Sequence, residues 1–109
     1  MATTYKVLGQ SAPSATTNTD IYTVPAGTQA VISTISVCNR TQGELSFRIA
    51  VRPNGETLAN KHYIAYDSKV SGQDSLFITV GITADAADVI TVYADTANLS
   101  FNVYGSEIA

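Results

Sequence analysis

The chain has 109 residues, of which 45% are hydrophobic and only 14% charged, and its formal net charge is −3 at pH 7. This size and composition predict one globular domain with a single core. An acidic chain whose six basic residues are scattered is not expected to bind nucleic acid or a membrane surface. One cysteine excludes an internal disulfide, and no apolar run reaches the roughly 20 residues of a membrane-spanning helix. The first residues lack the apolar core of a signal peptide, so we expect synthesis in a cytoplasm.

The first third of the chain predicts three strands and one irregular segment. Residues 4–8 and 20–24 are expected to be short strands and residues 29–39 a long one, rich in β-branched side chains. A Pro-Ala-Gly turn separates the second strand from the third. The small polar residues 11–19 are interpreted as a loop or arm that crosses between two sheets or lies on a neighbour.

Three later segments alternate apolar and polar residues with a period of two, which is typical of a strand with one buried face. They are residues 44–52, 75–81 and 98–104. Residues 61–66 and 88–95 alternate less cleanly but are also expected to be strands. Residues 83–88 are expected to form a single helical turn.

About eight short strands separated by turns predict an all-β fold. We expect a single antiparallel β-sandwich over residues 1–109, of the jelly-roll or immunoglobulin-like type. The apolar residues of these strands are expected to form its inner layer: Val24, Val31, Ile35, Val37, Leu45, Phe47, Ile49, Val51, Ile64, Leu76, Ile78, Val80, Ile90, Val92, Leu99, Phe101 and Val103.

Few side chains favour catalysis or metal binding. His62 is the only histidine and is interpreted as a surface or strand-edge residue. Cys38 lies in a β-branched strand and is interpreted as a small buried apolar side chain. Asp85, Asp88 and Asp95 lack the dense alternating oxygen ligands of a calcium site. We therefore expect no enzymatic activity, no cofactor and no metal.

Four tyrosines are better candidates for a site: Tyr63, Tyr66, Tyr93 and Tyr104. A tyrosine ring is large and apolar with a polar tip, which suits a protein interface. Contact with another protein, a half-buried core position and a platform for a sugar ring all stay open. Two arginines share one face of a predicted strand. We expect the interface to use residues 11–19 and five side chains: Tyr63, Tyr66, Tyr104, Arg48 and Arg52.

Four segments carry sequence features that are more specific than the alternation typical of a strand. They are residues 21–39 (IYTVPAGTQAVISTISVCN), 51–55 (VRPNG), 81–93 (GITADAADVITVY) and 99–108 (LSFNVYGSEI). Together they resemble segments of small virion structural proteins of tailed bacteriophages, including phages of marine cyanobacteria. The resemblance extends over nearly the whole chain and supplies no catalytic residue.

The resemblance implies a non-enzymatic structural protein of a tailed-phage virion, made in the host cytoplasm and located in the particle. Such a protein would dock on the capsid, as decoration or cement, or on the tail, baseplate or fibre. Its partners would be other virion proteins and further copies of itself, with a trimer as one form. The alternative function is a module of the phage adsorption apparatus that binds a glycan on the host surface.

Overall fold

The computed structural model describes residues 2–109, except the side chain of Val80. Within these residues it contains eight strands and two short 3-10 turns. The strands are β1 (Thr3–Ser11), β2 (Thr19–Thr23), β3 (Gln29–Asn39), β4 (Leu45–Arg52), β5 (Tyr63–Val70), β6 (Ser75–Ala84), β7 (Val89–Ala94) and β8 (Leu99–Ile108). The 3-10 turns η1 (Pro53–Gly55) and η2 (Asn60–His62) lie between β4 and β5.

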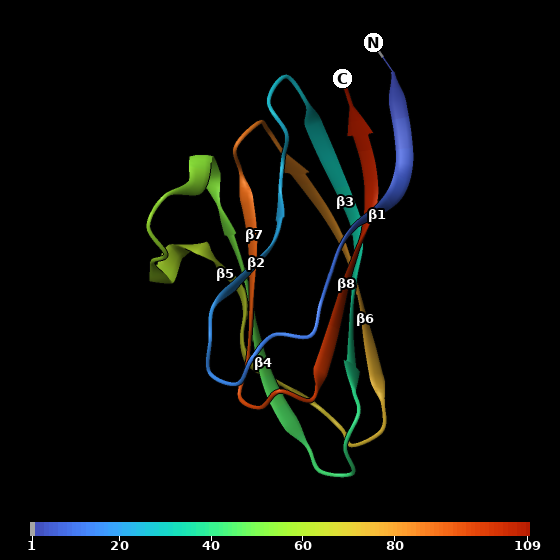
Figure 1. The fold of residues 1–109 in the computed structure, drawn as a ribbon, viewed down its shortest axis with the longest axis vertical. Coiled ribbons are helices and arrows are strands. Elements are labelled where there is room, and N and C mark those ends of the chain that lie inside the picture. Colours follow the sequence, from blue (N-terminus) through green and yellow to red (C-terminus); the bar gives the residue numbers. More distant parts are fainter. Residues whose placement is uncertain (1) are drawn as a thin grey trace.

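The strands form two antiparallel sheets, seen as two layers in Figure 1. Sheet I has the order β1-β8-β3-β6, and sheet II has the order β2-β7-β4-β5. Successive strands alternate between the sheets, except that β4 and β5 are neighbours in sheet II. This is the strand order of a jelly roll. The expected β-sandwich is thus confirmed, and of the two expected types it is the jelly roll.

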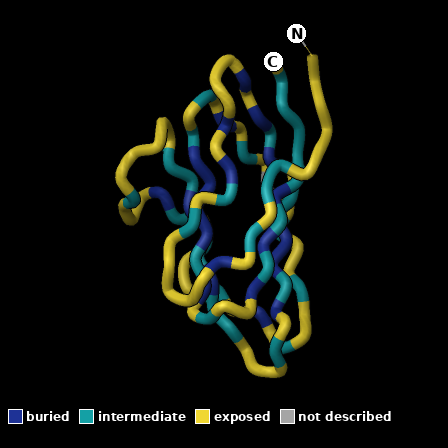
Figure 2. The backbone as a smooth tube through the Cα atoms, viewed as in Figure 1, coloured by how far each residue is buried: buried dark blue, intermediate teal, exposed yellow. Residues whose placement is uncertain are grey.

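Side chains from both sheets meet in one core between the layers. Figure 2 shows buried backbone positions, in dark blue, in both layers. The rings of Phe47 on β4 and Phe101 on β8 pack edge-to-face across it, with centroids 6.2 Å apart. The expected core residues that are buried are Val24, Ile35, Val37, Phe47, Ile49, Ile90, Val92, Leu99, Phe101 and Val103. Other apolar residues of the same core are Tyr22, Ala30, Ile32, Val70, Ala84 and Ala94, whereas Ala50 and Val89 are buried but do not belong to it.

A β-bulge in β3 explains one wrong core prediction. Ile32 and Thr34 pair with consecutive residues of β8, so Ser33 between them is an extra residue. Such an insertion moves the following side chains to the other face of the sheet. Ile32 is therefore buried, and Val31 lies half-buried on the outer face.

The edge strands explain the remaining differences. The register of β5 against β4 shifts twice, and Ile64 beside the second shift is 48% exposed instead of buried. Leu76 at the start of edge strand β6 is also exposed, because β6 has a neighbour on one side only. Three further residues of the expected core are only half-buried: Leu45, Val51 and Ile78. The expected core position of Val80 lies outside the described side chains.

The helical turn expected at residues 83–88 is wrong. Strand β6 continues to Ala84, and a tight turn follows in which the Asp88 N–H donates to the Asp85 carbonyl at 3.1 Å. Ala87 within this turn has a φ of 71°, which no α-helix accepts. The turn therefore connects sheet I directly to sheet II.

Candidate binding surfaces

Arg48 lies on the outer face of sheet II between two tyrosine rings. Its guanidinium carbon is 4.2 Å from the ring centroid of Tyr66 on β5 and 4.4 Å from that of Tyr93 on β7. Both distances are within the range of a cation–π interaction. Three strands thus supply one group of side chains, which we call the arginine cluster: Arg48, Tyr66, Asp67 and Tyr93.

A bulge in β5 brings Asp67 into the arginine cluster. The register shifts so that Arg48 lies opposite both Tyr66 and Asp67, and Asp67 takes a φ of 51°. The Arg48 Nε donates to Asp67 Oδ1 at 2.7 Å and Nη2 donates to Oδ2 at 3.4 Å. This hydrogen bond from Arg48 lowers the pKa of the Asp67 carboxyl below its usual range. The arginine charge is therefore neutralised within the cluster.

Tyr63 extends the aromatic surface next to the arginine cluster. In a regular strand Tyr63 and Tyr66 would point to opposite faces, but the shifted register of β5 brings their rings together edge-to-face at 4.9 Å. These two rings and Asn60 line an open hollow of about 490 Å³. An amide beside two rings can bind a polar ligand that also has an apolar face.

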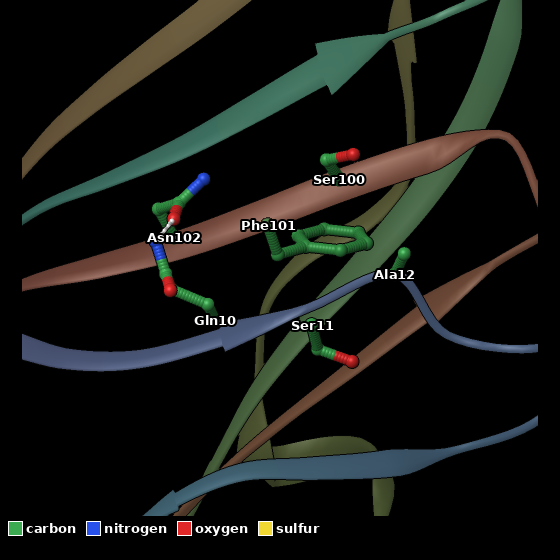
Figure 3. Close-up of a pocket in the computed structure, with 6 residues that line it drawn as sticks. All are labelled: Gln10, Ser11, Ala12, Ser100, Phe101 and Asn102. Atoms are coloured by element: carbon green, nitrogen blue, oxygen red, sulfur yellow. Dashed lines mark hydrogen bonds between the residues drawn. The ribbon is translucent and has the colours of Figure 1, made fainter.

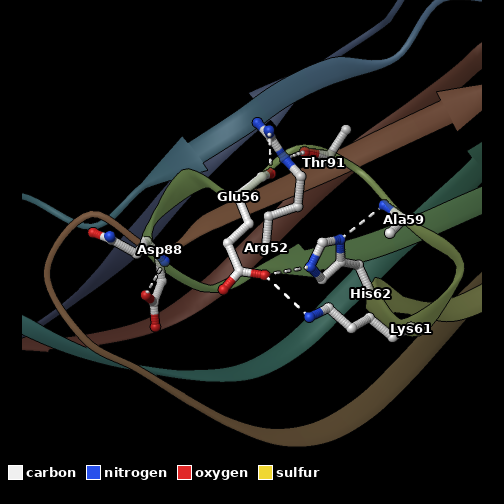
Figure 4. Close-up of polar contacts among 8 residues, drawn as sticks. Arg52, Glu56, Ala59, Lys61, His62, Asp88 and Thr91 are labelled. Atoms are coloured by element: carbon white, nitrogen blue, oxygen red, sulfur yellow. Dashed lines mark hydrogen bonds and ion pairs between the residues drawn. The ribbon is translucent and has the colours of Figure 1, made fainter.

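Arg52 links the strands of sheet II to one another instead of joining the arginine cluster. Its Nε donates to the Thr91 hydroxyl at 3.0 Å, and its Nη1 donates to the Glu56 carbonyl at 3.0 Å (Figure 4). Its Nη2 forms an ion pair with Asp20 at 2.8 Å. Arg52 thereby ties β2, β4 and β7 to the loop between η1 and η2, and its donors are largely used within the chain.

His62 is buried, and its expected place at the surface or at a strand edge is wrong. Its side chain is 3% exposed, and its Nδ1 accepts a hydrogen bond from the Ala59 N–H at 3.0 Å. Its Nε2 therefore carries the proton and lies 3.2 Å from Glu56 Oε1 (Figure 4). Hydrogen bonds from His62 and Lys61 lower the pKa of the Glu56 carboxyl. These contacts fold the loop on itself.

Tyr104 lies on the other side of the molecule, on the outer face of sheet I, so the structure does not bring it near Tyr63 or Tyr66. Besides the row Thr3–Ile108–Gln29 at one end, cross-strand neighbours form four rows on this outer face. The rows are Tyr5–Ser106–Val31–Thr83, Val7–Tyr104–Thr34–Thr79, Gln10–Asn102–Ser36–Phe77 and Ser100–Cys38–Ser75.

Side chains of adjacent strands contact each other along these rows. The Gln10 Nε2 donates to Asn102 Oδ1 at 2.7 Å, beside a hollow at the end of β1 (Figure 3). Ser36 is buried between its neighbours Asn102 and Phe77. Cys38, expected to be buried, is half-buried on this face and free.

The segment between β1 and β2 crosses from sheet I to sheet II. Pro13 is buried, and the Thr16 N–H donates to the Ala94 carbonyl at 2.8 Å. The middle of residues 11–19 is thus attached to the end of β7.

The aspartates near residue 88 bind backbone groups. Asp88 Oδ1 accepts from the Asn54 N–H at 2.8 Å, and its Oδ2 accepts from the Asp85 N–H at 2.9 Å. Within residues 2–109, no group of three or more His, Cys, Asp or Glu side chains is arranged to hold a metal ion. Nor is any helix of the described part of the chain long and apolar enough to cross a membrane.

The geometry defines a β-sandwich domain with two chemically different outer faces. The structure brings together Tyr63, Tyr66 and Arg48 of the five expected interface side chains. Tyr93 is a candidate tyrosine but not one of those five, and Asp67 is not predicted. In residues 88–95 the alternation places Tyr93 on the face opposite the apolar side chains of its strand. The sequence therefore already indicates that Tyr93 points outward. Neither the known protein-family models nor the curated proteins match this chain.

Proposed function

We propose that this protein is a non-enzymatic structural component of a tailed-phage virion, which docks through its outer sheet faces on other virion proteins and on copies of itself. The observation that carries the proposal is a jelly roll with two broad outer sheet faces, in which the buried polar side-chain atoms of the described residues are all hydrogen-bonded. The four segments that resemble small virion proteins support the same function. Jelly rolls build viral capsids, which supports it further by analogy of fold.

Docking would bury aromatic and hydroxyl-bearing side chains and cover the unpaired edges of the sheets. The edge strands are β1 and β6 in sheet I, and β2 and β5 in sheet II. An exposed edge invites pairing with another chain. Bulges and the charged Asp67 and Lys69 interrupt β5, whereas β6 carries no charged residue between Ser75 and Ala84. The edge of β6 is thus the better candidate for contact with a neighbour.

Purified phage particles provide the test. Mass spectrometry of the particles should detect this chain in a fixed ratio to the major capsid protein, and immunogold labelling should place it on the capsid or on the tail. Gold particles distributed over the head would support a decoration or cement protein, and gold at one tip would support a tail, baseplate or fibre component. Absence of the chain from particles free of host debris would contradict the proposal.

The hollow beside Tyr63, Tyr66 and Asn60 favours the second candidate, a module that binds a host-surface glycan. Two adjacent rings offer apolar surface to a sugar, and the Asn60 amide can both donate and accept hydrogen bonds. A glycan array probed with the wild-type chain and with Tyr63→Ala tests this function. Specific binding that Tyr63→Ala abolishes, and that the control Tyr5→Ala on sheet I retains, would support it. An array without specific binding would contradict it.

A further inference from the structure

The charged side chains are distributed unequally between the two sheets. The strands of sheet II carry Asp20, Arg48, Arg52, Asp67 and Lys69. The strands of sheet I carry only Lys6 and Glu107.

The charges of Lys6 and Glu107 are paired with each other, although Lys6 also lines a hollow with the outer-face residues Tyr5 and Tyr104. Lys6 and Glu107 form an ion pair at 2.7 Å, and Glu107 accepts a hydrogen bond from Tyr22, a core residue of β2 in the opposite sheet. The Glu107 carboxylate therefore points toward sheet II. Among the described side chains, the four rows on the outer face of sheet I contain no charge.

The same face is rich in groups that can pair with copies of themselves. Ser, Thr and Tyr hydroxyls and Asn and Gln amides each donate and accept hydrogen bonds, and these residue types make up most of the four rows. Large apolar side chains project among them: Tyr5 is 83% exposed and Phe77 is 69% exposed. The face is thus both apolar in places and self-complementary in hydrogen bonding.

A two-fold axis makes a special demand on an interface. Each residue near the axis meets its own copy, so any charge there faces a like charge. The uncharged rows avoid this repulsion, which matters in a chain whose net charge is −3. The nearest acidic residues of the β6–β7 turn, Asp85 and Asp88, lie at one end of the face beside Thr83. A different protein partner would impose no such demand, since it could supply opposite charges.

The size of the face is sufficient for a specific interface. Its strands have 9, 10, 11 and 10 residues. With a rise of about 3.3 Å per residue and a strand spacing of about 4.8 Å, the face covers on the order of 600 Å². Two such faces together reach about 1,200 Å², the lower end of the range for specific protein–protein interfaces.

We infer that the outer face of sheet I is a two-fold interface with a second copy of this chain, centred on the uncharged rows between Tyr5 and Phe77. This interface is the surface for the self-association that the proposed function includes. The inference depends on that self-association and on no other part of the proposed function. It specifies a dimer, not the trimer that the sequence left open, because a face that pairs with its own copy closes after two subunits.

Sedimentation velocity of the purified chain, from about 1 µM to about 1 mM, tests the inference. The wild-type chain should shift from monomer to dimer with rising concentration. The dimer should persist between about 0.05 and 1 M NaCl, because no charges at the interface are screened. Phe77→Arg buries a charge without an opposite partner in the interface and should weaken dimerisation at least tenfold. Tyr5→Arg, at a still more exposed position on the same face, should have the same effect.

Ile64→Arg is the matched control, since Ile64 is also an exposed apolar residue on an edge strand, but in sheet II. It should dimerise like the wild type. Circular dichroism and thermal unfolding would show that all three variants are folded. A wild-type chain that stays monomeric, or an Ile64→Arg variant weakened as much as Phe77→Arg, would overturn the inference. Neither result would remove the chain from purified particles, so failure here is distinguishable from failure of the virion proposal.

Discussion

The Tyr22 hydroxyl on β2 donates a hydrogen bond of 2.5 Å to the Glu107 carboxylate on β8 and so links sheet II to sheet I. The other carboxylate oxygen of Glu107 lies 2.7 Å from the Lys6 ammonium on β1. Three strands therefore meet in one polar contact at the margin of an apolar core. Because Tyr22 is 8% exposed, its hydroxyl depends on this partner.

Tyr22→Phe should remove part of the sensitivity of the fold to alkali. Burial, followed by the hydrogen bond to Glu107, raises the pKa of Tyr22 above its ordinary value of 10.0. The folded state therefore keeps the phenol proton when the unfolded chain loses it, and the stabilisation present below pH 10 is lost as the pH rises further. Urea unfolding at several pH values above 9 measures the slope. Tyr5→Phe, at an exposed position, should keep the wild-type slope, and an unchanged slope in Tyr22→Phe would contradict the assignment.

Glu107→Gln should reduce the loss of stability in acid. The hydrogen bond from Lys6, followed by that from Tyr22, lowers the pKa of Glu107 below its ordinary value of 4.5. A carboxyl with a lowered pKa stabilises the fold above its ordinary pKa, and this contribution is lost as the pH falls through the folded value. Glu107→Gln should be less stable than the wild type at pH 7, and the two should converge as the pH falls below the lowered pKa of Glu107. The exposed Glu44→Gln serves as the control, and equal stabilities at pH 7 would refute the prediction.

Arg48→Lys should destabilise the fold by about 0.5–1 kcal/mol, although it keeps the charge. Lysine lacks the planar guanidinium that lies against both the Tyr66 and Tyr93 rings, and it cannot bind Asp67 with two donors. The midpoint of urea unfolding measures the loss. Arg40→Lys is the matched control, because Arg40 donates one side-chain hydrogen bond, to the Ala97 carbonyl, which lysine can replace. Equal effects of the two substitutions would contradict a special role for the arginine cluster.

Gly105→Ala should cost about 1–3 kcal/mol of stability, the range found for overpacked interiors. A Cβ at Gly105 would collide with the Val31 carbonyl and crowd the Ile32 Cα, both of them backbone atoms that cannot rotate away. Gly43→Ala is the control, since a Cβ there meets nothing within 4 Å, and it should change stability by less than about 0.5 kcal/mol. Thermal unfolding of both variants gives the comparison. Similar melting temperatures for the two variants would contradict the prediction, because they would mean that β3 and β8 can move apart at the bulge of β3 to make room for the added Cβ.

Much of the fold is predictable from the sequence, because alternation is a local property. The alternation in residues 44–52 and 98–104 identifies Phe47 and Phe101 as core residues, and the structure confirms both. A bulge depends instead on pairing with a neighbouring strand. Ser33 in β3 therefore gives no local signal, and the prediction that Val31 is buried is wrong.

The candidate site is less predictable, because strand order is not local. The arginine cluster forms since β7 and β5 flank β4, and nothing near Arg48 in the sequence identifies Tyr93 as its neighbour. Tyr104 shares its residue type with Tyr66, but its strand belongs to the opposite sheet. Residue type therefore predicted surface tyrosines, and only the topology shows which of them act together.

The pairing of β1 with β8 extends to the ends of the described chain. Ala2 and Ala109 exchange two backbone hydrogen bonds, of 2.7 and 2.9 Å, and the two ends lie side by side in Figure 1. A label fused to either end would leave from the same tip of the sandwich. A fusion at one end and a fusion at the other would therefore give density at the same position in images of an assembled particle. That position would show which way the long axis of the domain points.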